Sequence, residues 1–135
     1  MKPSTAITVE ALLEEARRTL PPRPAPQEAH GLLMAGSALL VDIRGDDQRH
    51  RDGLIPGALV MARNSLEWRC DPTSQWRHEA IRDHDQQILL ICDEGFGSSL
   101  AAANLQRLGM HRATDVQGGF QAWRAAGLPV TPPGK

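Results

Sequence analysis

One stretch near the middle of the chain constrains the fold more than any other. Residues 87–91 form an apolar run with a single polar residue at its start, which is typical of a strand buried on both faces of a parallel sheet. A short loop containing Gly95 and Gly97 follows. The spacing of apolar residues then predicts a helix over 99–108, with Gly109 as its stop signal. This order of strand, tight loop and helix predicts one unit of an α/β fold.

The first residue after this strand is a cysteine, Cys92. The N–H groups of a tight loop and the positive end of a helix dipole would surround its sulfur and favour the thiolate. A thiolate is a nucleophile at neutral pH. The alternative is a small buried hydrophobic residue, although buried cysteines seldom end a strand beside two glycines and two serines. We therefore interpret Cys92 as the candidate nucleophile.

The rest of the chain continues the alternation of strands and helices. Further strands are expected over 38–44, 59–61 and 113–116, and further helices over 9–20, 27–35, 45–52 and 120–126. The sequence therefore predicts an α/β fold with a central, mostly parallel sheet of about five strands and helices on both faces.

Prolines divide the chain near its start. Residues 1–26 are expected to form a helix capped by Thr8 and then a proline-rich linker, which we interpret as a spacer. The alternative for the linker is a docking motif for a proline-reading partner. Residues 27–130 are expected to form the main domain, and residues 131–135 a short tail.

Composition excludes several classes of function. The chain has 135 residues, as one domain would, and 15 basic residues against 16 acidic ones give a net charge of −1, which does not favour nucleic-acid binding. No apolar run is long enough to cross a membrane, and the N-terminus has no apolar signal core, so we expect a cytoplasmic protein. Two cysteines make no disulfide framework.

Other polar residues are weaker candidates for a site. Asp42 and Arg44 lie at the end of the predicted strand 38–44, where open α/β sheets keep their sites, although a helix cap or a surface ion pair is an equal alternative. Arg63 begins an irregular stretch, 63–85, that could form the rim of a pocket with Trp68 and Arg69. The alternative there is that the tryptophans simply cover the edge of the core.

The cysteines and histidines do not predict a metal site. Cys70, His78, His84 and Cys92 are spaced too widely for the ligand pairs of structural zinc, and no nucleotide-binding motif is present, so we expect no metal and no cofactor. Cys70 could form a disulfide with Cys92 or resolve its oxidised form, which spacing alone leaves open. A Cys-x5-Arg phosphatase would need an arginine at position 98, where this chain has Ser98.

Four motifs together resemble the rhodanese family of sulfurtransferases, over residues 27–130. The first is the strand ending Asp-Ile-Arg at 42–44, and the second is the turn Gly-Leu-Ile-Pro-Gly-Ala at 53–58. The third is the loop 92–98 after the central strand. The fourth is Gly-Gly-Phe-Gln-Ala-Trp at 118–123, followed by Gly-Leu-Pro-Val at 127–130. The motifs occur in the order that is typical of the family.

The resemblance implies a persulfide cycle. Cys92 would take a sulfane sulfur from thiosulfate or a low-molecular-weight persulfide and pass it to cyanide, a thiol or a protein acceptor. The N–H groups of the loop would hold the persulfide. From their positions in the chain, we expect Asp42, Arg44 and Arg63 to support this site. The loop residues are Asp93, Glu94, Gly95, Phe96, Gly97 and Ser98. The alternative is a non-catalytic rhodanese-like binding or regulatory module.

The sequence departs from the family pattern in three places. Gly97 stands where many members have arginine, Leu54 replaces the usual histidine, and Asp93 and Glu94 place two acids beside the nucleophile. At an effective dielectric constant of ~20, one negative charge about 6 Å away disfavours an anion by about 3 kcal/mol. We therefore expect thiosulfate to be a poor donor and a less anionic persulfide or a protein partner to be preferred.

Overall fold

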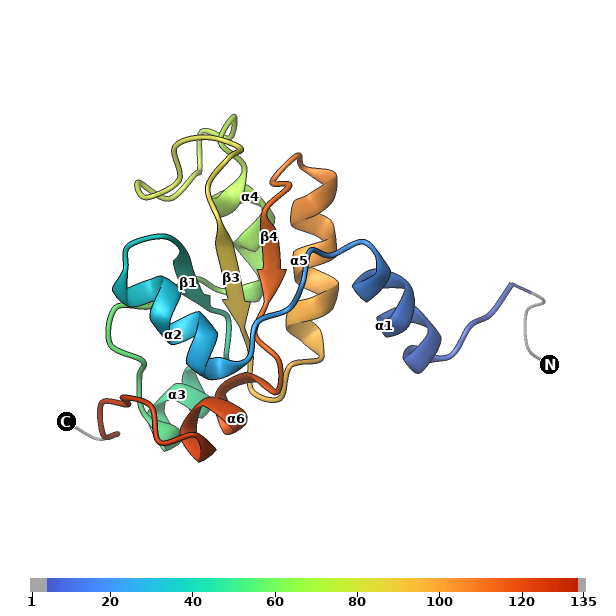
Figure 1. Cartoon of the computed structure of the whole chain (residues 1–135). Helices are drawn as coiled ribbons and strands as arrows, with labels where there is room; N and C mark the ends of the chain where they lie inside the picture. The colour runs from blue at the N-terminus through green and yellow to red at the C-terminus, as the bar shows by residue number, and fades with distance from the viewer. Residues whose placement is uncertain (1–4, 134–135) are drawn as a thin grey trace.

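A computed structural model describes residues 5–133. Its centre is a parallel sheet of four strands in the order β2-β1-β3-β4 (Figure 1). The strands are β1 (Leu39–Asp42), β2 (Leu59–Val60), β3 (Ile88–Ile91) and β4 (Ala113–Asp115). The helices are α1 (Val9–Arg18), α2 (Pro26–Met34), α3 (Asp46–Asp52), α4 (Leu66–Cys70), α5 (Gly97–Arg107) and α6 (Gly119–Ala125), with a 3-10 turn η1 (Arg63–Ser65). Each expected element is present, with ends that differ by at most two residues.

The central strand β3 is fully buried, as its apolar run predicts. It pairs in parallel with β1 on one side and β4 on the other, with Leu40 beside Leu89 and Leu89 beside Thr114. Because side chains alternate along a strand, Leu89 and Leu90 point to opposite faces. Each face therefore builds its own hydrophobic core.

Helices cover both faces of the sheet, as expected. One core lies under α4 and α5 and contains Val41, Leu66, Cys70, Leu90, Ala101, Leu105 and Met110. The other lies under α2 and α6 and contains Ala29, Leu40, Leu89, Ile91, Phe120 and Trp123. The Trp123 indole N–H also donates to the carbonyl of Pro129 (2.9 Å), which satisfies the polar atom of this buried ring.

The expectation of about five strands is wrong, since the described residues form four. The place of a further strand beside the edge strand β4 is taken by the linker over 21–25. Pro24 accepts a hydrogen bond from the Gln117 N–H (2.9 Å), and Pro21 accepts one from the Thr114 hydroxyl (3.1 Å). Three of the five linker residues are prolines, which have no N–H to donate, so the linker covers this edge without forming a ladder.

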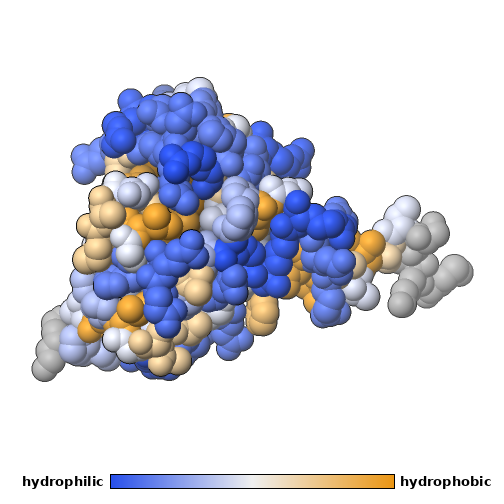
Figure 2. Space-filling model, viewed as in Figure 1, coloured by the Kyte–Doolittle hydropathy of each residue, from blue (hydrophilic) through white to orange (hydrophobic). Residues whose placement is uncertain are grey.

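The N-terminal helix α1 lies against the outer side of α5 (Figure 1). As predicted, Thr8 caps it: the Thr8 hydroxyl accepts from the Ala11 N–H (3.1 Å). Apolar side chains at its outer end, such as Ile7 and Val9, are exposed, and Figure 2 shows hydrophobic colour at that end of the molecule. In residues 5–133 no helix combines the length and apolar character needed to cross a bilayer.

Parallel pairing brings the carboxyl ends of the strands to one edge of the sheet. Asp42 ends β1, Cys92 follows β3 and Asp115 ends β4. All three lie at the edge where open α/β sheets bind their ligands. The fold therefore places two carboxylates and the candidate nucleophile on neighbouring strands.

Candidate active site

Cys92 is the first residue of the loop that joins β3 to α5, and it is only partly buried. Its sulfur accepts a hydrogen bond from the Gly95 N–H (N···S 3.2 Å) and lies 3.2 Å from the Ser98 hydroxyl oxygen. Within the described residues, Gly95 supplies the one loop N–H that bonds this sulfur. The arrangement can stabilise a sulfur anion with one backbone donor and one hydroxyl.

A pair of glycines, Gly118 and Gly119, presses directly on this loop. Both have positive φ, and a Cβ on Gly119 would lie 2.6 Å from the Cys92 carbonyl oxygen and 2.7 Å from the Gly95 nitrogen. The Phe120 N–H, which follows, donates to the Cys92 carbonyl (2.8 Å). The glycine pair lets the start of α6 approach closely enough to hold the nucleophile's own backbone.

Beneath the sulfur lies a buried carboxylate, Asp115, which is fully shielded from solvent. It accepts hydrogen bonds from the hydroxyls of Ser98 (2.6 Å) and Ser99 (2.8 Å), both in the first turn of α5. Arg23 completes its shell with bonds of 2.7 Å from Nε and 3.2 Å from Nη2. The Ser98 hydroxyl therefore links Cys92 to a compensated buried charge.

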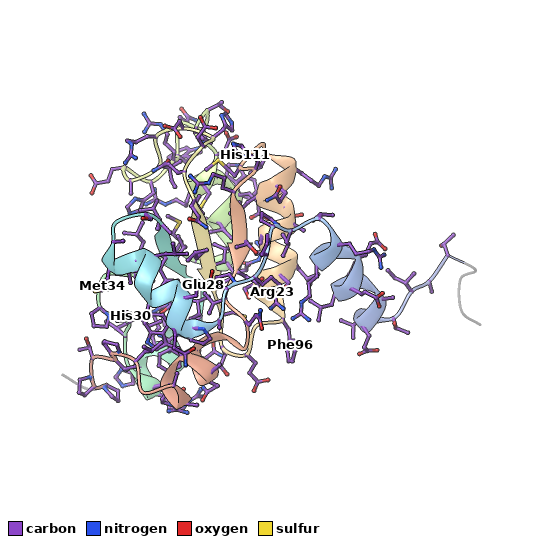
Figure 3. The ribbon with its side chains drawn as sticks, viewed as in Figure 1. Arg23, Glu28, His30, Met34, Phe96 and His111 are labelled. Atoms are coloured by element: carbon purple, nitrogen blue, oxygen red, sulfur yellow. The ribbon has the colours of Figure 1, made fainter. Side chains whose placement is uncertain are left out.

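A second arginine, Arg17, reaches the same cluster from the last turn of α1. Its Nη2 donates to the Gly95 carbonyl (2.7 Å) and its Nε donates to the Ser99 hydroxyl (3.0 Å). Arg23 also donates to the Gly95 carbonyl (3.2 Å), and Figure 3 shows this side chain between the linker and α5. We define Arg17, Arg23, Ser98, Ser99 and Asp115 as the support cluster.

Sequence reasoning missed four members of the support cluster: Arg17, Arg23, Ser99 and Asp115. Asp115 carried a usable signal, since it ends a strand exactly as Asp42 does, at the same edge of the sheet. The arginines carried none, because they lie about seventy residues or more before their partners in the chain and their helix and linker match no catalytic motif.

The sulfur opens onto a cavity of about 320 Å³. Its lining includes Cys92 and other predicted site residues, namely Arg44, Asp93, Glu94, Phe96 and Gly97, together with Ile43 and Gln48. Phe96 is exposed and projects from the loop away from the sheet (Figure 3). The cavity gives a small substrate access to the sulfur.

Arg44 and Asp42 form a buried ion pair at the side of this cavity, not a surface pair. The Arg44 guanidinium donates from Nη2 to Asp42 (2.7 Å) and to the Gly53 carbonyl (2.9 Å), and it stacks 3.8 Å from the centre of the Phe120 ring. This pair ties the end of β1 to the turn at 53–58 and to α6. Both residues therefore hold the walls of the site, with their charges mutually compensated.

The two loop acids have different surroundings. The Asp93 carboxylate accepts a hydrogen bond from the Gln121 side chain (2.9 Å), which turns it towards α6. Glu94 is exposed to solvent beside the cavity. Both acids remain close enough to the opening to oppose an anionic substrate.

Some candidates lie outside this arrangement. Arg63 pairs with Glu67 (3.0 Å) and does not line the Cys92 cavity. Trp68 and Trp76 are each more than half exposed, so neither covers the core edge. In the part of the chain that the structure describes, no three His, Cys, Asp or Glu side chains gather as metal ligands.

The two cysteines are not bonded to each other. Cys70 is fully buried in the core under α4, with its sulfur 3.6 Å from that of Met61, and both cysteines are free. Burial, with a further contribution from the nearby Glu67 carboxylate, raises the pKa of the Cys70 thiol to about 12. Its burial and raised pKa therefore disfavour Cys70 as a disulfide partner or a resolving thiol for Cys92.

The region that contains this site is similar to known proteins. The sequence model of the rhodanese-like domain matches residues 25–126. The thiosulfate sulfurtransferase GlpE of Vibrio cholerae is 32% identical over 102 residues, which span 76% of this chain and 87% of that protein.

Two solved structures are similar over most of their length. A Rhodopseudomonas palustris protein of unknown function, described as a possible tyrosine phosphatase, is 32% identical with a TM-score of 0.84, covering 97% of this chain and 99% of its own. The human single-domain sulfurtransferase has a TM-score of 0.65 and 24% identity, covering 78% of this chain and 96% of its own. The latter likeness shows the fold alone.

The close approach of Gly119 predicts a large effect of a single methyl group. Gly119→Ala should lower the free energy of unfolding by about 1–3 kcal/mol more than Gly127→Ala. Both glycines have positive φ, but a Cβ on Gly127 meets nothing within 4 Å, so the matched variant carries the backbone strain without the clash. Urea unfolding measures both, and equal losses would contradict the close packing of α6 on the loop.

The two thiols should differ sharply in reactivity. We expect iodoacetamide at neutral pH to add one carbamidomethyl group to the native protein, at Cys92, because the buried Cys70 thiol stays protonated below its raised pKa. Intact mass and peptide mapping identify the modified residue, and denatured protein should take two groups. Modification of Cys70 in the native state would contradict its burial in the core.

Proposed function

The chain belongs to the rhodanese-like domain family, and we propose that it is a sulfurtransferase that carries a sulfane sulfur on Cys92. The observation that carries the proposal is the setting of the Cys92 sulfur. It follows the central strand, opens onto a small cavity, and has a backbone N–H and a hydroxyl within 3.2 Å. The curated relative from Vibrio cholerae is named for the same class of reaction.

In the first half of the proposed cycle, the Cys92 thiolate attacks the outer sulfur of a sulfane sulfur donor. With thiosulfate, a new S–S bond forms at Cys92 while the S–S bond of thiosulfate breaks. Sulfite leaves with the bonding electron pair, and Cys92 becomes a persulfide anion. With a low-molecular-weight persulfide, the corresponding leaving group is a thiolate.

In the second half, an acceptor attacks the outer sulfur of the persulfide. Cyanide takes this sulfur and becomes thiocyanate, and the electron pair of the broken S–S bond returns to Cys92 as thiolate. A small-molecule or protein thiolate would instead become a persulfide. The cycle needs no metal or cofactor, because each half is a nucleophilic displacement at sulfur and Cys92 carries the covalent intermediate.

Ser98 gives the cycle a donor that can change partner. When Cys92 is a thiol, its S–H can donate to the Ser98 oxygen while the Ser98 O–H donates to Asp115. When the sulfur is an anion, the Ser98 O–H can turn to it. Asp115 then keeps its bonds from Ser99 and Arg23, so the change leaves no unpaired carboxylate oxygen.

The same geometry disfavours a phosphatase. A Cys-x5-Arg phosphatase holds phosphate with an arginine six residues after the cysteine, and this position is Ser98, which is bonded to Asp115. Arg17 and Arg23 donate to the Gly95 carbonyl instead.

The charges at the cavity opening bear on which sulfur donor is preferred. Asp93 and Glu94 add negative charge at its opening, so we propose that the preferred donor is less anionic than thiosulfate: a low-molecular-weight persulfide or a protein persulfide. A free thiol at Cys92 persists in a reducing compartment, which is the basis for expecting activity in the cytoplasm.

The persulfide itself is directly measurable. Incubation with a sulfane sulfur donor should add the mass of one sulfur atom to the native protein, and cyanide should remove it with release of thiocyanate. Cys92→Ser should take up no sulfur, whereas Cys70→Ser should behave as the parent protein. The absence of an adduct with thiosulfate, glutathione persulfide and polysulfide would instead favour a non-catalytic binding module.

The loop acids should determine the response to thiosulfate. Asp93→Asn with Glu94→Gln should lower the KM for thiosulfate severalfold, because two negative charges leave the cavity opening. Glu28→Gln with Glu79→Gln changes net charge equally at exposed, remote positions and serves as the control. Steady-state kinetics at low salt separate the two, and equal KM values would remove the proposed role of the acids.

A further inference from the structure

We propose that Arg17 and Arg23 are positioning residues of the Cys92 site, supplied by the segment that precedes the rhodanese-like region. They hold the loop by its Gly95 carbonyl and give the support cluster one excess positive charge that an anionic Cys92 sulfur neutralises. For the thiolate the inference stands on the structure alone, and for the persulfide it rests on the proposed function.

Hydrogen bonds fix the orientation of Gly95. This residue uses its N–H to bond the Cys92 sulfur, while its carbonyl accepts from both Arg17 (2.7 Å) and Arg23 (3.2 Å). Gly95 also adopts a positive φ of 86°, in contact with Gly118. With both polar groups bonded, Gly95 is fixed in the orientation that directs its N–H at the sulfur.

The support cluster carries a net positive charge. Arg17 and Arg23 bring two positive charges and Asp115 brings one negative charge, so the groups around Ser98 and Ser99 carry one positive charge in excess. The Arg17 guanidinium is partly buried, and this burial, followed by the neighbouring Arg23 charge, lowers the pKa of Arg17. The nearby charges of Asp115 and Cys92 act in the opposite direction. An anionic sulfur therefore relieves the repulsion between the two arginines.

The charged residues that line the cavity supply no excess positive charge. Arg44 lines the cavity but is paired with Asp42, which cancels its charge. Asp93 and Glu94, on the loop itself, are negative. Among charged side chains, the two arginines of the support cluster therefore provide the excess positive charge for the sulfur anion, beside the loop N–H and the start of α5.

The N-terminal segment that carries both arginines is anchored on the rest of the fold. Arg17 lies in the last turn of α1, which packs on α5, and Arg23 lies in the linker that covers β4. The Gln117 backbone N–H and side-chain amide bond the carbonyls of Pro24 (2.9 Å) and Arg23 (2.6 Å). Both arginines precede residue 25, where the family match begins, so the site of this chain includes residues beyond the family domain.

Alkylation of Cys92 tests the inference without any sulfur donor. In the full chain, Arg17→Gln should slow carbamidomethylation of Cys92 at neutral pH roughly tenfold, the size of one charge-assisted hydrogen bond. The rate at alkaline pH, where the thiolate is fully formed, should be retained, so the midpoint of the pH–rate profile moves upward. Arg17→Lys keeps the charge and should recover most of the neutral rate.

A charge-compensation pair separates electrostatics from packing. Arg23→Gln alone makes the cluster neutral and should slow alkylation, whereas Arg23→Gln with Asp115→Asn restores one excess positive charge and should react faster than the single variant. A purely structural role predicts the reverse, because the second substitution removes further hydrogen bonds. Arg18→Gln, an exposed arginine next to Arg17 in sequence that pairs only with Glu14, should leave the rate unchanged.

Each outcome decides the inference. Rates and pH midpoints of Arg17→Gln and Arg23→Gln that equal those of Arg18→Gln would overturn it, as would a double variant slower than Arg23→Gln. If Arg23→Gln fails to fold by circular dichroism, Arg17→Gln and Arg17→Lys carry the test. Because alkylation needs no donor, slowed alkylation in a protein that never forms a persulfide would contradict the proposed function and leave the role of the arginines intact.

Discussion

The site depends on one buried carboxylate. Asp115 is completely removed from water, and such a charge is strongly destabilising unless hydrogen bonds and an opposite charge compensate it. Two hydroxyls from the first turn of α5 and two nitrogens of Arg23 supply that compensation. The same bonds join a strand, a helix and the N-terminal linker at one point, and the Cys92 sulfur lies one hydroxyl away from it. The loop geometry therefore follows from satisfying a charge that the fold has buried.

The surrounding structure delivers these groups to the same place. Parallel pairing aligns the ends of β1, β3 and β4, so Asp42, Cys92 and Asp115 meet at one edge of the sheet. The glycine pair at 118–119 then allows α6 to contact the loop backbone, and the Arg44–Asp42 pair closes the other wall. Apolar packing fixes the strands and helices, and the polar groups at the edge determine where the sulfur sits.

Much of this was predictable from the sequence because it is local. The apolar run at 88–91, the glycines of the loop and the Gly118–Gly119 turn each have a direct backbone meaning, and the corresponding elements are confirmed within two residues. The expected count of about five strands was wrong: the described residues form four, and the linker beside β4 is rich in prolines, which cannot extend a ladder. Arg17 and Arg23 could not be predicted, since their partners lie far along the chain and only the packing of α1 and the linker brings them together. Cys92 as the nucleophile stays a prediction.

The family match covers residues 25–126, and Arg17 and Arg23 reach the same site from the segment before it. The central claim is that a sulfur anion at Cys92 sits against the Gly95 N–H, with two N-terminal arginines holding Gly95 from behind. A crystal structure of the protein soaked with a sulfane sulfur donor tests this most directly. The account predicts density for a second sulfur on Cys92, inside the cavity and within hydrogen-bonding distance of loop N–H groups, with Arg17 and Arg23 still bonded to the Gly95 carbonyl. A terminal sulfur that points out to solvent, or arginines that have left Gly95, would contradict it.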